Sequence, residues 1–150
     1  MKTTLLNMCV FLIAVTGCKN ADIEKVRITE LNGDEINLTS FQGKTVFINL
    51  WATWCGPCIQ EMPTIDKAQA ALKDNNVVFL FASNEDPDEI KEFMQRRLFN
   101  FHYVRLLNME ELKIPGLPTT YIFDSNGKLK FSETGTRDWN QPENLNLITK

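Results

Sequence analysis

The hydrophobic and polar positions before residue 83 predict β-strands in three places. Val26–Leu31 alternates, whereas Thr45–Trp51 and Val77–Ala82 are nearly continuous apolar runs. Alternation is typical of a strand with one buried face, and a continuous run is typical of a strand buried on both faces. Asn32-Gly33-Asp34 is a hairpin turn signal, after which Ile36 resumes the alternation. We therefore expect an N-terminal hairpin followed by two buried strands.

Helical periodicity separates these strands. Apolar residues recur at three- or four-residue spacing between the two continuous runs, namely Ile59, Met62, Ile65, Ala68 and Leu72. This spacing predicts an amphipathic helix. Asp86-Pro87-Asp88-Glu89 places acids and a proline where a second helix should begin, and we expect that helix to end at about Phe99.

The last third of the chain predicts shorter elements. They are a strand over His102–Leu107, a loop over Pro115–Pro118, a strand over Thr119–Phe123, its hairpin partner over Leu129–Thr134, and a closing helix over Pro142–Ile148. This order predicts an α/β fold: a central mixed sheet flanked by helices, with a helix–strand insertion and an N-terminal hairpin.

The first residues have the features of an export signal. Lys2 is followed by the apolar run Leu5–Val15, whose eleven residues are fewer than the ~20 that a membrane-spanning helix needs. Val15-Thr16-Gly17-Cys18 resembles the lipobox of bacterial lipoproteins, which implies a diacylated Cys18. We expect a signal peptide over residues 1–17, a lipidated tether over 18–25 and one folded domain over 26–150. The alternative is an ordinary cleaved signal that leaves Cys18 free.

The cysteines and the composition limit the classes of function that the chain could have. Of four cysteines, Cys9 would leave with the signal and Cys18 would carry lipid, so Cys55 and Cys58 remain as the pair with free sulfurs. A disulfide across so short a loop removes little entropy from the unfolded chain, which favours a chemical role over a structural one. The net charge is −3 and 43% of residues are hydrophobic, so nothing indicates nucleic acid as a partner.

The residues Trp54-Cys55-Gly56-Pro57-Cys58 form the most specific motif of the chain. With the preceding Asn49-Leu50-Trp51-Ala52-Thr53, this stretch resembles the active-site region of thioredoxin. Glu61-Met62-Pro63 and the inserted helix and strand are similar to the membrane-associated TlpA/ResA branch of the thioredoxin superfamily. The resemblance implies a thioredoxin-like fold and thiol–disulfide exchange.

The two cysteines are expected to have different roles. Cys55 sits where a strand ends and a helix begins, and there unpaired N–H groups favour a thiolate, which is the attacking species. Gly56 and Pro57 suit the tight entry into that helix. Cys58 follows one turn later. We therefore expect Cys55 to be the nucleophile and Cys58 the resolving thiol, with a Cys55–Cys58 disulfide in the oxidised state.

Four further residues are assigned from position and resemblance. Glu61 lies three residues after Cys58, and the resemblance implies a role in proton handling, because Asn49 replaces the strand acid of thioredoxin; the alternative is a surface glutamate. The resemblance also implies a cis bond before Pro118, with the Leu117 backbone pairing with an extended client segment. Trp54 is expected to flank the sulfur and contact the client.

The sequence therefore predicts an extracytoplasmic, lipid-anchored enzyme, most simply a monomer, that reduces disulfides of client proteins with electrons from a membrane donor. For this branch the resemblance implies apocytochrome c as a client. A net disulfide-forming oxidase and a redox-inert binding module remain the alternatives. No cofactor is expected, and no metal, since a closed zinc site needs four ligands and the chain adds one histidine, His102, to the cysteine pair.

Overall fold

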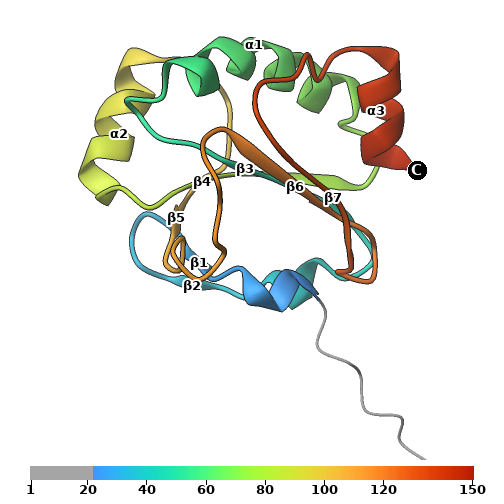
Figure 1. Cartoon of the computed structure of the whole chain (residues 1–150), viewed down its shortest axis with the longest axis horizontal. Helices are drawn as coiled ribbons and strands as arrows, with labels where there is room; N and C mark the ends of the chain where they lie inside the picture. The colour runs from blue at the N-terminus through green and yellow to red at the C-terminus, as the bar shows by residue number, and fades with distance from the viewer. Residues whose placement is uncertain (1–21) are drawn as a thin grey trace, which may run out of the picture.

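A seven-stranded mixed sheet organises the fold, with the strands in the order β2-β1-β5-β4-β3-β6-β7 (Figure 1). The computed structural model describes residues 22–150. The strands are β1 (Ile28–Thr29), β2 (Glu35–Ile36), β3 (Thr45–Leu50), β4 (Val77–Ser83), β5 (Tyr103–Leu106), β6 (Thr119–Phe123) and β7 (Leu129–Thr134). β3, β4 and β5 pair in parallel, and the remaining neighbours pair antiparallel. The predicted mixed sheet and N-terminal hairpin are therefore confirmed.

In the described part of the chain, three α-helices connect or follow the strands. They are α1 (Gly56–Ala71), α2 (Pro87–Arg96) and α3 (Pro142–Thr149). α2 and β5 form the predicted helix–strand insertion. The helix ends at Arg96 rather than at about Phe99, because Arg97 adopts an extended conformation. The chain leaves the helix there to stack Phe99 on Phe101 and Phe101 on Phe81 in the core, with ring centroids 5.1 and 3.7 Å apart.

The sheet separates two hydrophobic cores. α1, α2 and α3 cover one face, where Met62, Ile90 and Ile148 are buried with Phe47. Two 3₁₀ turns, η1 (Asp22–Lys25) and η2 (Leu38–Phe41), cover the opposite face together with the segment before β6 (Figure 1). Within residues 22–150, α-helices thus flank the sheet on one side only. Both faces of β3 and β4 are enclosed, which explains their continuous apolar runs.

The boundary of the folded domain lies earlier than the sequence indicated. Residues 22–25, predicted to belong to the tether, form η1 and pack on the sheet, with Ile23 only 2% exposed. The Ile23 N–H also donates to the carbonyl of Gly127 at 3.0 Å. The segment is mostly polar, and the sequence therefore did not indicate that its one apolar side chain, Ile23, is buried. The predicted signal peptide and the lipidation site Cys18 lie outside the described residues.

Candidate functional site

Cys55 and Cys58 lie at the start of α1 and are joined by a disulfide. The S–S distance is 1.99 Å and the Cα atoms are 5.3 Å apart. Cys55 is the N-cap of the helix, and its sulfur accepts a hydrogen bond of 3.2 Å from the Cys58 N–H. An N-cap acceptor satisfies one of the unpaired donors of the first turn. The same donor and the helix macrodipole would stabilise a Cys55 thiolate after reduction.

The surroundings of the pair give the two cysteines different access to solvent. Cys58 is fully buried, whereas Cys55 keeps 4% of its surface exposed. Trp54, immediately before Cys55, is 75% exposed, and Gly56 and Pro57 are also exposed. Of the two cysteines, only Cys55 keeps any exposed surface in the folded protein.

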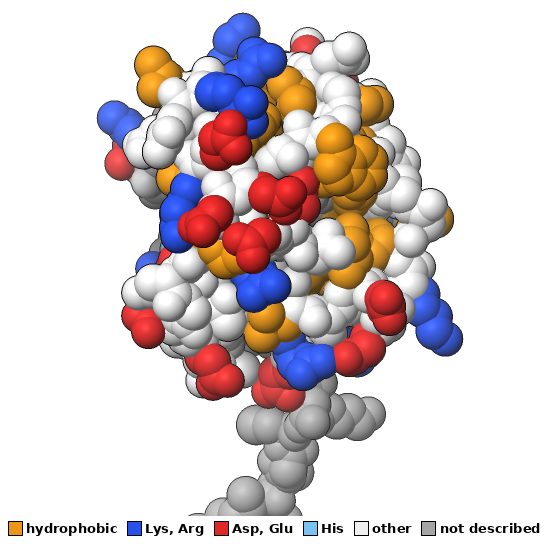
Figure 2. Space-filling view, turned by 90° about the vertical axis from the view of Figure 1, so that its left-hand side faces the viewer, with side chains coloured by type: hydrophobic (Ala, Val, Ile, Leu, Met, Phe, Trp, Pro, Cys, Tyr) orange, Lys and Arg blue, Asp and Glu red, His pale blue; other side chains and the backbone are white. Residues whose placement is uncertain are grey.

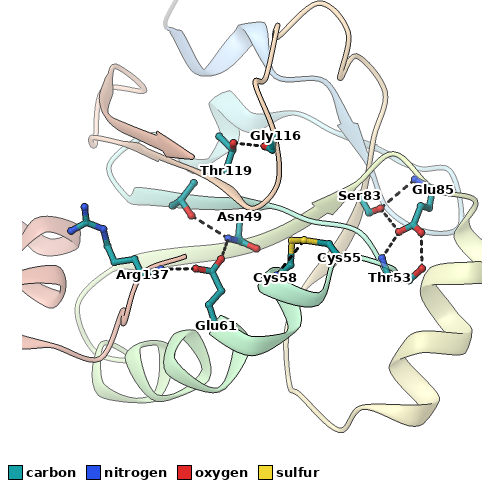
Figure 3. Close-up of a disulfide and its surroundings, with 11 residues drawn as sticks. Asn49, Thr53, Cys55, Cys58, Glu61, Ser83, Glu85, Gly116, Thr119 and Arg137 are labelled. Carbon is teal, nitrogen blue, oxygen red and sulfur yellow. Dashed lines mark hydrogen bonds between the residues drawn. A yellow bond between two sulfur atoms is a disulfide. The ribbon is translucent and has the colours of Figure 1, made fainter. Parts of the chain in front are cut away.

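Glu61 is buried beneath this site and is not a surface residue. Only 3% of it is exposed, and Oε1 accepts a hydrogen bond of 2.9 Å from the Asn49 side-chain amide. Oε2 accepts one of 3.1 Å from the backbone N–H of Arg137. The β3–β6 register places Thr120 opposite Asn49, which donates to the Thr120 hydroxyl at 3.1 Å. Figure 3 shows this cluster on one side of the disulfide.

Burial raises the pKa of Glu61, and the hydrogen bonds from the Arg137 backbone and the Asn49 amide only partly oppose this rise. The Arg137 guanidinium does not neutralise the carboxylate, because it is bound to Glu133 and Asn144. Glu61 lines a pocket of about 260 Å³ together with Thr64 and Arg137.

The Leu117–Pro118 peptide bond is cis, as predicted. Thr119 begins β6 opposite Leu50, the last residue of β3, so Pro118 lies at the edge of the sheet from which the active-site loop emerges. The Thr119 hydroxyl donates to the Gly116 carbonyl at 2.7 Å and closes the loop. Within residues 22–150 the backbone of Leu117 makes no hydrogen bond, whereas the Pro118 carbonyl accepts from Gly135.

Trp51, His102 and three methionines lie in the hydrophobic cores or on the surface. Trp51 is fully buried in the core. His102 is a surface residue whose Nε2 lies 2.9 Å from Glu30. Met62 is buried, and Met94 and Met109 are partly buried against the two cores. In the part of the chain that the structure describes, no three or more His, Cys, Asp or Glu side chains are grouped so as to hold a metal ion.

Comparison with known proteins agrees with this geometry. The family model described as Redoxin matches residues 19–148. The chain belongs to the Redoxin family. A curated relative, the thiol-disulfide oxidoreductase ResA of Geobacillus kaustophilus, is 35% identical over 115 residues, which are 73% of this chain and 65% of the relative. The chain thus spans slightly less than two thirds of that relative's length.

Solved structures show the same fold for this Redoxin-family protein. The thioredoxin domain of a thiol-disulfide oxidoreductase from Bacteroides vulgatus matches with a TM-score of 0.70 at 22% identity, covering 83% of this chain and 92% of the other. A thiol:disulfide interchange protein from Chlorobium tepidum matches with a TM-score of 0.67 at 21% identity, covering 83% and 94%. The thioredoxin-like fold predicted from the sequence is confirmed.

Other features of this Redoxin-family protein lie away from the disulfide. A pocket of about 460 Å³ opens between η1 and η2, and no cysteine or Glu61 lines it. The face that carries α2 has Asp and Glu side chains gathered near its centre, beside hydrophobic side chains (Figure 2). Among residues 22–150, no helix combines the length and the apolar character needed to cross a membrane.

Two groups that contact the active-site elements were not predicted from the sequence. One is the Arg137 backbone N–H that binds Glu61, which no local pattern marks because it comes from a loop 76 residues away. The other is Glu85, whose carboxylate binds Thr53 in the loop before Cys55. Glu85 was not predicted to contribute to the site. Its position two residues after a strand that runs parallel to β3 was the available signal.

Proposed function

We propose that this protein is an extracytoplasmic thiol–disulfide oxidoreductase that reduces disulfide bonds in client proteins. The observation that carries the proposal is the Cys55 sulfur at the N-cap of α1, bonded to the Cys58 sulfur and bound by the Cys58 N–H at 3.2 Å. A sulfur held this way is stabilised as the anion that disulfide exchange requires. The homologous ResA oxidoreductases support the same reaction.

The reduced enzyme would act in two exchange steps. The Cys55 thiolate attacks one sulfur of a client disulfide, so that a bond forms between Cys55 and the client while the client S–S bond breaks. The leaving client thiolate keeps the electron pair and takes up a proton. Cys58 then loses its proton and attacks the Cys55 sulfur, which releases the second client thiol. Two electrons have passed to the client, and the Cys55–Cys58 disulfide remains.

Glu61 is the proposed acceptor of the Cys58 proton. It lies three residues after Cys58 on α1, on the same helix face, and is buried with the resolving cysteine. Since burial raises the pKa of Glu61, its carboxylate is a stronger base than an exposed glutamate. The pocket beside Arg137 lets the proton pass on to solvent.

The client segment would bind between Trp54 and the cis-proline loop. Trp54 offers a largely exposed aromatic surface beside Cys55, and the free backbone groups of Leu117 can pair with an extended chain. Exposed Gly56 and Pro57 leave room for that chain at the sulfur. Pro118 would then form the wall of the site facing the cysteines.

Export, lipid attachment at Cys18 and supply of electrons by a membrane dithiol donor are part of the proposal. Their support is the apolar N-terminal run and the lipobox-like sequence before Cys18. Cytochrome c maturation is the proposed process, with apocytochrome c as client, by resemblance to the TlpA/ResA branch. We propose a monomeric working unit.

Reduction of insulin disulfides by dithiothreitol-recycled protein tests the activity, with Cys55→Ser as the matched variant. Wild type should accelerate reduction and the variant should not. Equal rates would refute the role of Cys55. The reduction potential decides the direction, because a value far above about −270 mV, that of thioredoxin, would favour the oxidase alternative. Redox-inert wild type would favour the binding module.

A Cys58→Ser variant expressed in the native cells should accumulate mixed disulfides through Cys55. Capture of apocytochrome c and of a membrane dithiol protein would support the proposed process. Metabolic labelling with palmitate tests lipidation, since label should be lost in Cys18→Ser. Unlabelled wild type would leave the ordinary cleaved signal as the explanation.

A further inference from the structure

Glu85 binds the loop that carries the nucleophile. Its Oε2 accepts hydrogen bonds of 2.8 Å from the Thr53 N–H and of 2.8 Å from the Ser83 hydroxyl. Its Oε1 accepts one of 2.6 Å from the Thr53 hydroxyl. Both carboxylate oxygens are therefore used, and Thr53 is bound through its backbone and its side chain together. Figure 3 shows this cluster on the opposite side of the disulfide from Glu61.

The bound loop is the short connection between β3 and α1. Its start is fixed by the Trp51 N–H, which donates to the Ala82 carbonyl at 3.1 Å. Its end is closed by the Cys55 N–H, which donates to the Ala52 carbonyl at 3.1 Å. Between these points, Thr53 is the residue that Glu85 holds. A residue of the β4–α2 connection thus binds the loop that leads to Cys55.

Glu85 has no other evident task in the described part of the chain. The neighbouring Asp86, not Glu85, is the N-cap of α2, and its capping box is completed by Glu89. No ion pair within residues 22–150 involves Glu85. A partly buried carboxylate that accepts only from Ser83 and Thr53 is committed to this loop, and such charge-assisted hydrogen bonds are the stronger kind.

We infer that Glu85 is a positioning residue that acts on Cys55 through Thr53 and keeps the nucleophile at the helix N-cap. The inference rests on the proposed function. Without the carboxylate, the Thr53–Trp54 turn is free to move, and the Cys55 sulfur spends less time where the Cys58 N–H binds it. Small displacements of a reacting group are costly, because a misplacement of about 1 Å can lower a rate by about 100-fold.

Two substitutions of Glu85 distinguish an effect of its hydrogen bonds on the position of the loop from an effect of its negative charge. Glu85→Ala removes every hydrogen bond of the carboxylate. Glu85→Gln removes the charge but can keep the geometry: its carbonyl oxygen accepts from the Thr53 N–H and the Ser83 hydroxyl, and its amide donates to the Thr53 hydroxyl, which can also accept. Glu92→Ala is the matched control, since Glu92 is an exposed acid of α2 whose ion-pair partner is Arg96.

The two readouts are kcat/KM for insulin reduction and the pH profile of Cys55 alkylation in a Cys58→Ser background. We expect Glu85→Ala to lower kcat/KM about tenfold and to move the alkylation profile to higher pH, because the thiolate loses its donor. Glu85→Gln should recover most of the rate, with an alkylation profile at or below that of wild type. Glu92→Ala should match wild type in both readouts.

The outcomes are distinct. If Glu85→Ala and Glu85→Gln both move the alkylation profile to lower pH, Glu85 acts through its charge and the inference is wrong. Unchanged rate and profile in Glu85→Ala would also overturn it. If wild type fails to reduce insulin, the proposed function fails, while the alkylation profile still tests the position of Cys55. Should Glu85→Ala not fold, Thr53→Val removes one of the hydrogen bonds, and a rate equal to that of wild type would contradict the inference.

Discussion

The side-chain amide of Asn49 in β3 donates a hydrogen bond of 2.9 Å to the carboxylate of Glu61 in α1. Thioredoxin, by the resemblance that the motif carries, has an acid at the strand position. In this protein the carboxylate comes from the helix instead, and the strand supplies a neutral donor. One ionisable group therefore occupies the buried space, and Asn49 also binds the Thr120 hydroxyl at 3.1 Å.

Glu61→Gln should slow disulfide exchange, because the resolving thiol loses its proton acceptor. We expect a fall of about 100-fold at neutral pH, the low end of what a positioned base contributes. The measurement is the rate at which a mixed disulfide on Cys55 resolves, followed across pH. The variant should also lose the pH dependence due to Glu61. Unchanged kinetics across pH would remove Glu61 from the mechanism.

The same carboxyl should make stability depend on pH. Because burial raises the folded-state pKa of Glu61 above its unfolded value, the folded state holds a proton that the unfolded chain releases. Stability is then greatest below the unfolded pKa and falls as pH rises through the folded pKa. The fall is about 1.4 kcal/mol for each pH unit between the two values. Urea unfolding of the oxidised protein should show this slope in wild type and a flatter one in Glu61→Gln.

Asn49→Asp should create a coupled pair of buried carboxyls. The new group would face Oε1 of Glu61 at hydrogen-bond distance, and two carboxylates so close cannot both ionise without a large penalty. We expect a loss of about 3 kcal/mol in unfolding free energy at mildly alkaline pH, and a smaller loss in acid. The double variant Asn49→Asp with Glu61→Gln is the control. It should recover most of the loss, and failure to do so would show that the two groups do not interact.

Substitution of the two tryptophans of the motif region should have different effects. Trp54→Ala should weaken client binding, and Trp51→Ala should lower stability. Trp54→Ala should leave the unfolding free energy within about 0.5 kcal/mol of wild type, because the side chain is 75% exposed. Its kcat/KM should fall about tenfold through a higher KM, since exposed aromatics of this kind anchor partners. Trp51→Ala should lower the unfolding free energy by about 3–5 kcal/mol, because it leaves an internal cavity. Loss of stability in Trp54→Ala would contradict this division.

Ile23→Ala tests whether η1 belongs to the folded domain. Ile23 is buried in the same hydrophobic cluster as Leu38 and Val46, so its truncation should lower the unfolding free energy by about 2–3 kcal/mol. Lys25→Ala is the control, because its ion pair with Asp22 is exposed and contributes little. Equal stability of Ile23→Ala and Lys25→Ala would indicate that this segment belongs to the tether and not to the folded domain.

Local sequence signals determined the elements of the fold and the reacting pair. The apolar runs of β3 and β4, the helical spacing in α1 and the Cys55–Cys58 motif each depend on neighbouring residues, so they can be read along the chain. The end of α2 could not be predicted in this way, because stacking of Phe99 on Phe101 competes with helix continuation. η1 could not be predicted either, since the burial of a single isoleucine holds an otherwise polar segment on the sheet.

The surroundings of the sulfurs were decided only by tertiary structure. Spacing placed Glu61 near Cys58, but its burial, and hence its raised pKa, comes from the Arg137 loop and from β3 closing over it. Glu85 gained its role because two parallel strands end side by side and bring Thr53 within 2.6 Å of its carboxylate. Hydrogen bonds between distant segments depend on the packing of the whole sheet, and no local pattern encodes them.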